Sequence, residues 1–85
     1  MAYDYNKEKS YLFTDEGQRE FLQVRDNVKR LLEEAGAFST CKAWKGVSGD
    51  SWQMLAMIDR LVELKEIREI SQYGVSQQAR VFVEA

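Results

Sequence analysis

The sequence predicts a mainly α-helical protein with a small β-hairpin, an α+β fold, within a single domain of 85 residues. Apolar residues recur at three- and four-residue spacing over two long segments, as they do on one face of an amphipathic helix. Near the end of the chain, the run Val81-Phe82-Val83 is typical of a β-strand. The content of 45% hydrophobic and 31% charged residues is that of a chain that folds around a core.

The first helix is predicted over residues 15–35. Thr14 or Asp15 begins it, and Asp15 with Gln18 has the three-residue spacing of a capping box. Gly36 follows as a residue that readily adopts the left-handed conformation in which helices commonly end. The helix is predicted to turn one apolar face to the core, formed by Phe21, Val24, Val28, Leu31, Leu32 and Ala35.

Two further helices are predicted, a short one over 39–45 and a longer one over 51–64. The inner face of the short helix is expected to carry Cys41 and Trp44. Asp50 is the expected N-cap of the longer helix, which is apolar almost all round. A helix of this kind is expected to lie in the middle of the core with neighbours on both sides.

A β-hairpin is predicted from strands at 66–71 and 79–84, joined by a polar loop that contains Gly74. Ile67 and Ile70 would face opposite sides of the first strand, so a bulge or bend is expected there. The residues expected to be mostly buried in the whole chain are Phe21, Val24, Val28, Leu31, Trp44, Met54, Ile58, Leu61, Leu64, Val81 and Val83.

Residues 1–13 are interpreted as an N-terminal arm and residues 14–85 as the domain. The arm is rich in aromatic residues, namely Tyr3, Tyr5, Tyr11 and Phe13. One interpretation is that Tyr11, Leu12 and Phe13 pack back onto the domain. The other is that the arm covers a partner subunit.

The order of these elements resembles that of the winged helix-turn-helix family: a long helix, a short helix, a Gly-Val-Ser turn, a core helix and a hairpin with a polar loop. The most specific part is the run GVSGDSWQMLAMIDRLVELKEIREI. It is similar to a recognition helix that closes on a Leu-x-x-Leu pair, Leu61 and Leu64, and passes through Ile67 into the first wing strand.

The resemblance covers roughly residues 15–84 and implies a three-helix winged helix-turn-helix, bacterial in type. Two departures from the family pattern stand out. Lys65 occupies a position where the family commonly has glycine, and Asp50 and Trp52 stand where its DNA readers favour small polar or basic residues.

Double-stranded DNA is the partner that the resemblance implies, with a role in transcription regulation through helix 51–64 and wing 72–80. No acidic residue lies between Glu34 and Asp50, which gives one face a neutral-to-basic character despite the net charge of −2. The residues expected to contact DNA are Lys42, Lys45, Ser51, Gln53, Arg60, Tyr73, Gln77 and Arg80. So few cations predict weak binding by one copy, and a homodimer is therefore expected.

The alternative hypothesis is a winged-helix adaptor that binds another protein and no DNA. In this interpretation Trp52 and Leu55 point away from the core and anchor the interface, because tryptophan is a frequent anchor of protein contacts. Tyr3 and Tyr5 of the aromatic arm would contribute to the same surface.

Catalysis is not expected. The chain has no histidine and one cysteine, and it has no glycine motif that would cradle a phosphate. Neither a cofactor nor a metal is expected, because a single cysteine without histidine cannot build a zinc site. Cys41 as the sole cysteine excludes an internal disulfide and favours the cytoplasm, and no apolar run approaches the length of a membrane span.

Overall fold

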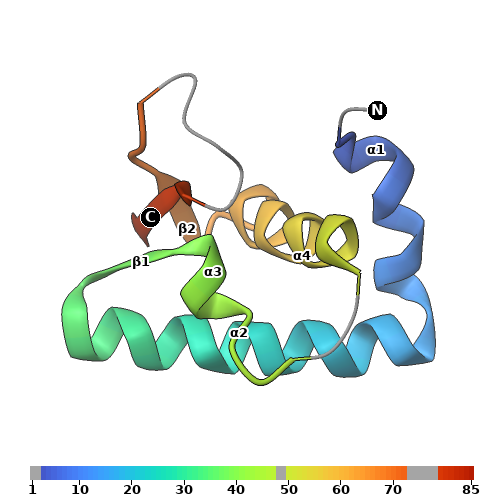
Figure 1. Ribbon diagram of the computed structural model, residues 1–85, viewed down its shortest axis with the longest axis horizontal. Coiled ribbons are helices and arrows are strands. Elements are labelled where there is room, and N and C mark those ends of the chain that lie inside the picture. Colours follow the sequence, from blue (N-terminus) through green and yellow to red (C-terminus); the bar gives the residue numbers. More distant parts are fainter. Residues whose placement is uncertain (1–2, 48–49, 73–78) are drawn as a thin grey trace.

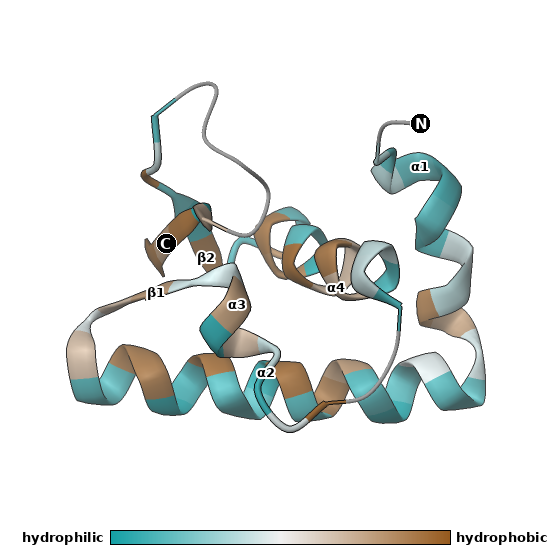
Figure 2. Cartoon of the chain, in the orientation of Figure 1, coloured by the Kyte–Doolittle hydropathy of each residue, from teal (hydrophilic) through white to brown (hydrophobic). Residues whose placement is uncertain are grey.

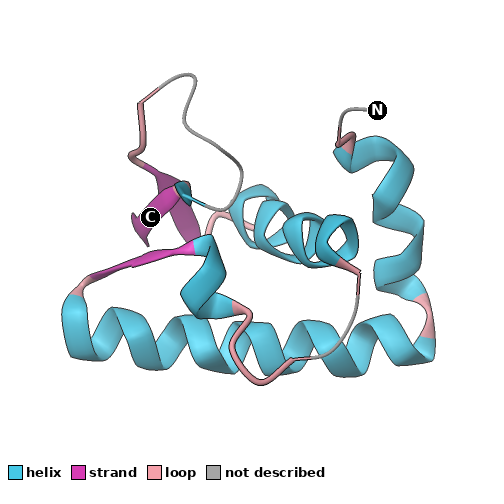
Figure 3. Ribbon diagram, viewed as in Figure 1, coloured by secondary structure: helices cyan, strands magenta, loops and turns pink. Residues whose placement is uncertain are grey.

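A computed structural model describes residues 3–47, 50–72 and 79–85 of the chain. The protein is mainly helical, with a small antiparallel sheet at one end of its longest helix (Figures 1 and 3). In order, the elements are α1 (Tyr5–Glu8), the 3-10 helix η1 (Lys9–Phe13), α2 (Asp15–Ala35), β1 (Ala37–Ser39), α3 (Thr40–Ala43), α4 (Ser51–Glu63), β2 (Ile67–Glu69) and β3 (Val81–Glu84). The predicted α+β class is therefore confirmed.

Helix α2 has the predicted bounds. Of the two residues proposed to begin it, Thr14 is the N-cap, and its side chain accepts a hydrogen bond from the backbone N–H of Gly17. The helix ends at Gly36, whose φ of 77° is the expected left-handed conformation. The proposed capping box does not form, because the side-chain amide of Gln18 donates instead to the backbone carbonyl of Leu12.

The sheet has three strands where two were predicted. Strand β3 lies in the middle and pairs in antiparallel fashion with both β1 and β2. Phe38 of β1 lies opposite Phe82 of β3, and their rings stack with centroids 5.5 Å apart. Strand β1 was missed because three residues between a helix end and a helix start are too few to display a period of two.

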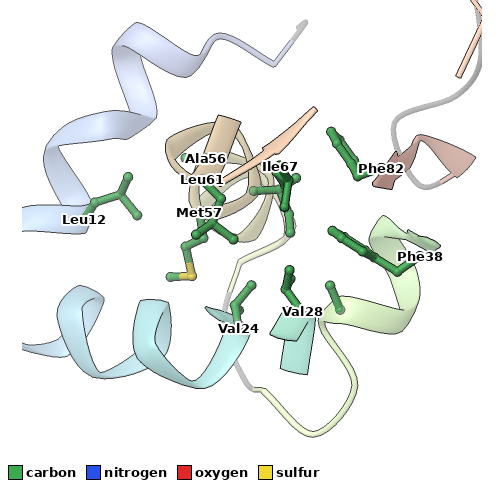
Figure 4. Close-up of a cluster of buried hydrophobic side chains, with 11 residues drawn as sticks. Leu12, Val24, Val28, Phe38, Ala56, Met57, Leu61, Ile67 and Phe82 are labelled. Atoms are coloured by element: carbon green, nitrogen blue, oxygen red, sulfur yellow. The ribbon is translucent and has the colours of Figure 1, made fainter. Parts of the chain in front are cut away.

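Helix α4 lies at the centre of the core, as its apolar composition predicted. Six of its thirteen residues are buried, and α2, β2 and the N-terminal helices all pack against it. Apolar positions of α4 face both α2 and the sheet (Figures 2 and 4). The buried cluster comprises Leu12, Val24, Val28, Phe38, Ala43, Ala56, Met57, Ile58, Leu61, Ile67 and Phe82.

Several predicted core positions are wrong. Leu64 is 43% exposed; α4 ends at Glu63, one residue earlier than predicted, and Leu64 is its C-cap. In β3 the buried residue is Phe82, whereas Val81 and Val83 face the other side of the strand and are half-buried. Cys41 is exposed, since the inner positions of α3 are Thr40 and Ala43. The remaining partial discrepancies are half-buried residues, namely Phe21, Leu31 and Trp44.

The first hairpin strand is shorter than predicted. Strand β2 stops at Glu69, and Ile70 lies just beyond it with its side chain 49% exposed. Ile67, by contrast, is buried. The two isoleucines therefore do differ in orientation, but the strand ends where a bulge was expected.

Lys65 is the one non-glycine residue with a positive φ, 61°, among the described residues. A side chain in the left-handed region costs about 1–2 kcal/mol through the close approach of Cβ to the following carbonyl. Glycine avoids that cost but loses more conformational entropy on folding. Lys65→Gly is therefore expected to raise the free energy of unfolding by about 0.5–1 kcal/mol, as measured by urea denaturation.

The matched control is Lys42→Gly, which places the same substitution in α3. There glycine is expected to lower stability by about 1 kcal/mol, because the backbone is helical. A destabilising Lys65→Gly would show that the side chain contributes more than its conformation costs.

Candidate nucleic-acid interface

Two of the cations expected to contact DNA, Lys42 and Lys45, are exposed and close together in the chain. Lys42 lies in α3 and Lys45 in the turn that follows it. The side-chain amide of Asn27 on α2 donates to the carbonyls of Ala43 (3.0 Å) and Lys45 (3.2 Å). This pair of hydrogen bonds fixes the turn against α2, so the two lysines project from a backbone that is held in place.

The start of α3 is anchored on the other side. Thr40 is fully buried, and its backbone N–H donates to the carbonyl of Arg80 at 3.1 Å. Because Arg80 immediately precedes β3, this bond ties the short helix to the central strand of the sheet. The segment that carries the lysines is thus held by α2 at one end and by the sheet at the other.

The N-terminus of α4 lies beyond this turn. Asp50 is its N-cap, as predicted, and its carboxylate accepts from the backbone N–H of Trp52 at 2.8 Å. Ser51 is exposed, and Gln53 and Trp52 are half-buried. The donors needed for a phosphate are therefore present at this end of the helix, but the Asp50 carboxylate occupies one of its free N–H groups and carries the same charge as a phosphate.

Arg80, another expected DNA contact, is part of an ion-pair network at the base of the hairpin. Its guanidinium lies 2.9 Å from carboxylate oxygens of both Asp59 and Glu69 and packs over the ring of Phe82. Burial disfavours the charged guanidinium, yet the two carboxylates outweigh this effect and raise the pKa of Arg80. The side chain is only 14% exposed and contributes to the fold rather than to an open cationic surface.

Arg60 is also engaged within the chain. It forms an ion pair with Glu63 one turn along α4, and its guanidinium lies over the ring of Phe13. Glu63 in addition accepts from Lys9 (2.9 Å) and from the hydroxyl of Tyr5 (3.0 Å). The hydrogen bond from Lys9 lowers the pKa of Glu63 most, followed by those from Arg60 and Tyr5, and together they bring it to about 2.

The N-terminal helices α1 and η1 pack against α4, and η1 also contacts α2. The hydroxyl of Tyr3 donates to Asp59 at 2.6 Å, and burial together with this bond raises the pKa of Tyr3. Ala56, one turn before Asp59, is fully buried, and so is Leu12 of η1. The interpretation that the arm packs back onto the domain is confirmed for Tyr11 and Leu12. It is wrong for Phe13, which is 59% exposed.

The residues of the adaptor hypothesis lie in different surroundings. Leu55 is buried in the core, which conflicts with the expectation that it points outward. Tyr3, Tyr5 and Trp52 are all half-buried, and the hydroxyls of Tyr3 and Tyr5 donate to carboxylates on α4 of the same chain. The remaining expected DNA contacts, Tyr73 and Gln77, lie outside the described residues.

Sequence reasoning missed Asn27 and Asp59, the residues that position the lysine turn and Arg80. Neither left a recognisable signal, because each is one polar residue on a helix and its partner lies 16 or more positions away. In the described part of the chain, no cluster of three potential ligand side chains could hold a metal ion. No helix there has the length and apolar character needed to span a membrane.

Comparisons with protein-family models, with curated proteins and with solved structures gave no match for the chain.

Proposed function

We propose that the chain is a non-enzymatic winged helix-turn-helix domain that binds duplex DNA through the lysine edge, defined here as α3, the turn through Lys45 and the N-terminus of α4. The element order supports the winged-helix assignment, since a long helix, a short helix, a central helix and a hairpin follow one another. A cytoplasmic location and a role in transcription regulation belong to the same proposal.

One observation carries the DNA proposal: Lys42 and Lys45 are exposed on a fixed backbone, in a segment from 35 to 49 that has no acidic residue. Phosphate contacts of this kind position a protein on a duplex without reading its sequence. The ion pairs of Arg60 and Arg80 remove both from the expected set. Two lysines predict weak binding with a modest salt dependence, about 0.9 units of log–log slope for each phosphate neutralised.

Lys42→Gln with Lys45→Gln is expected to abolish binding to random duplex DNA at low salt, because both cations of the lysine edge are then neutral. Fluorescence anisotropy over a salt series measures the affinity and its slope. The control is Lys7→Gln with Arg19→Gln, which removes two exposed cations from α1 and α2. It should leave both quantities close to those of the native chain.

If both double variants lose the same amount of DNA affinity, binding depends on net charge and not on the lysine edge. If the native chain fails to bind at low salt, the DNA proposal is wrong.

A second candidate is a winged-helix adaptor for another protein. It is supported by Trp52, a half-buried tryptophan at the exposed N-terminus of α4 beside the capping residue Asp50. Absence of DNA binding would leave this as the better proposal.

A further inference from the structure

We propose that Arg30 of α2 is a third phosphate contact beside the lysine edge, in addition to Lys42 and Lys45. This inference rests on the proposed DNA binding and names a residue that the sequence did not assign to it. The turn after α3 crosses over α2 (Figure 1), and the side chain of Asn27 joins the two. Arg30 lies three positions after Asn27, on the same side of the helix.

Asn27 links Arg30 to the turn through the two ends of its side-chain amide. The amide nitrogen donates to the carbonyls of Ala43 and Lys45, at 3.0 Å and 3.2 Å, which leaves the amide oxygen as an acceptor. That oxygen accepts from a guanidinium N–H of Arg30 at 3.4 Å. One side-chain amide therefore separates the guanidinium from the backbone of the turn.

Arg30 takes this direction although acidic residues surround it on α2. Asp26 precedes it by four positions, and Glu33 and Glu34 follow it by three and four, which are the spacings at which helix ion pairs form. Within the described parts of the chain, Arg30 forms an ion pair with none of them. In contrast to Arg80, its guanidinium has no carboxylate of the described residues in contact with it.

The exposure and the chemistry of Arg30 suit a phosphate. The residue is exposed, as are Lys42 and Lys45. A guanidinium carries several N–H donors, of which the contact with Asn27 uses one, and its planar shape can bind two phosphate oxygens at once. With Arg30 as a third contact, the expected salt dependence of DNA affinity rises from about 1.8 to about 2.7 units of log–log slope.

Arg30→Gln tests the proposal, with binding of the full chain to random duplex DNA measured by fluorescence anisotropy over a salt series. The variant should lower the affinity at low salt about as much as Lys42→Gln does, and it should reduce the slope by about 0.9 units. Lys29→Gln is the matched control, because it removes another exposed cation from the adjacent position of α2. Lys29 is two positions from Asn27 and lines a cleft on another side of the helix, so affinity and slope should stay close to native.

Arg30→Lys keeps the charge and should restore most of the slope that Arg30→Gln loses. The melting temperatures of all three variants should stay close to that of the native chain, because both side chains are exposed. This measurement separates the loss of a DNA contact from a loss of folding.

If Arg30→Gln has the same affinity and slope as Lys29→Gln, this inference is wrong. The proposed function would still stand in that case, provided that Lys42→Gln with Lys45→Gln loses binding. If the native chain does not bind DNA at low salt, the proposed function is wrong and this inference is wrong with it.

Discussion

Phe82→Ala is expected to lower the free energy of unfolding by about 3–5 kcal/mol, the range for removing a buried phenylalanine. The side chain is fully buried on the central strand of the sheet and stacks on Phe38 across β1. Alanine would leave a cavity against Phe38 and remove the apolar surface over which the Arg80 guanidinium packs. In a domain of this size the loss would be comparable to the whole stability. Urea denaturation followed by circular dichroism measures it.

Val83→Ala is the control for the orientation of β3. Val83 is the next residue on the strand but faces the other side and is half-buried, so truncation should cost about 1 kcal/mol or less. A larger loss for Val83 than for Phe82 would mean that β3 turns its other face to the core, as the sequence predicted.

Gly17→Ala is expected to destabilise the protein, although the same change inside a helix ordinarily stabilises by about 1 kcal/mol. A Cβ atom at Gly17 would lie 2.0 Å from the backbone carbonyl oxygen of Tyr11 and 3.0 Å from the hydroxyl oxygen of Thr14. Because the obstructing atom is backbone, the corner between η1 and α2 must move. Such overpacking typically costs about 1–3 kcal/mol, to be measured as a fall in melting temperature.

Glu16→Ala is the comparison, since it introduces the same residue at an exposed position of the same helical turn. It should change stability by no more than about 0.5 kcal/mol. A Gly17→Ala variant as stable as the native chain would contradict the close packing of η1 on the start of α2.

Helices α2, α3 and α4 could be predicted because their signals are local, whereas α1 and η1 were missed in the segment interpreted as an arm. Thr14 and Asp50 cap helices through side-chain hydrogen bonds to nearby backbone N–H groups, and Gly36 ends α2 through its left-handed conformation. The apolar spacing of α2 and α4 extends over several turns. Which residues of β3 face the core could not be predicted in the same way. In Val81-Phe82-Val83 all three residues are apolar, so the pattern does not distinguish the buried face. That choice depends on Phe38, which lies 44 positions earlier.

In the candidate site, too, local features could be predicted from the sequence and contacts between distant residues could not. The exposure of Lys42 and Lys45 follows from a polar turn with no acid nearby in the sequence. Whether Arg80 is free to contact a ligand depends on Asp59 and Glu69, which the fold brings close to it from α4 and β2. An isolated arginine in a polar hairpin gives no sign of such partners, and only the packing of the hairpin on α4 assigns it to the fold.

Asp59 serves two parts of the chain at once, since one carboxylate oxygen accepts from Tyr3 and the other from Arg80. Because of this sharing, the residues that can replace Tyr3, Asp59 or Arg80 depend on one another. A substitution at Asp59 would leave a buried guanidinium with one carboxylate fewer and an N-terminal tyrosine without its acceptor, so few replacements are acceptable while both partners remain. Among descendants of a common ancestor, the tyrosine, the aspartate and the arginine should therefore be inherited or lost together, whereas neighbouring surface positions drift independently.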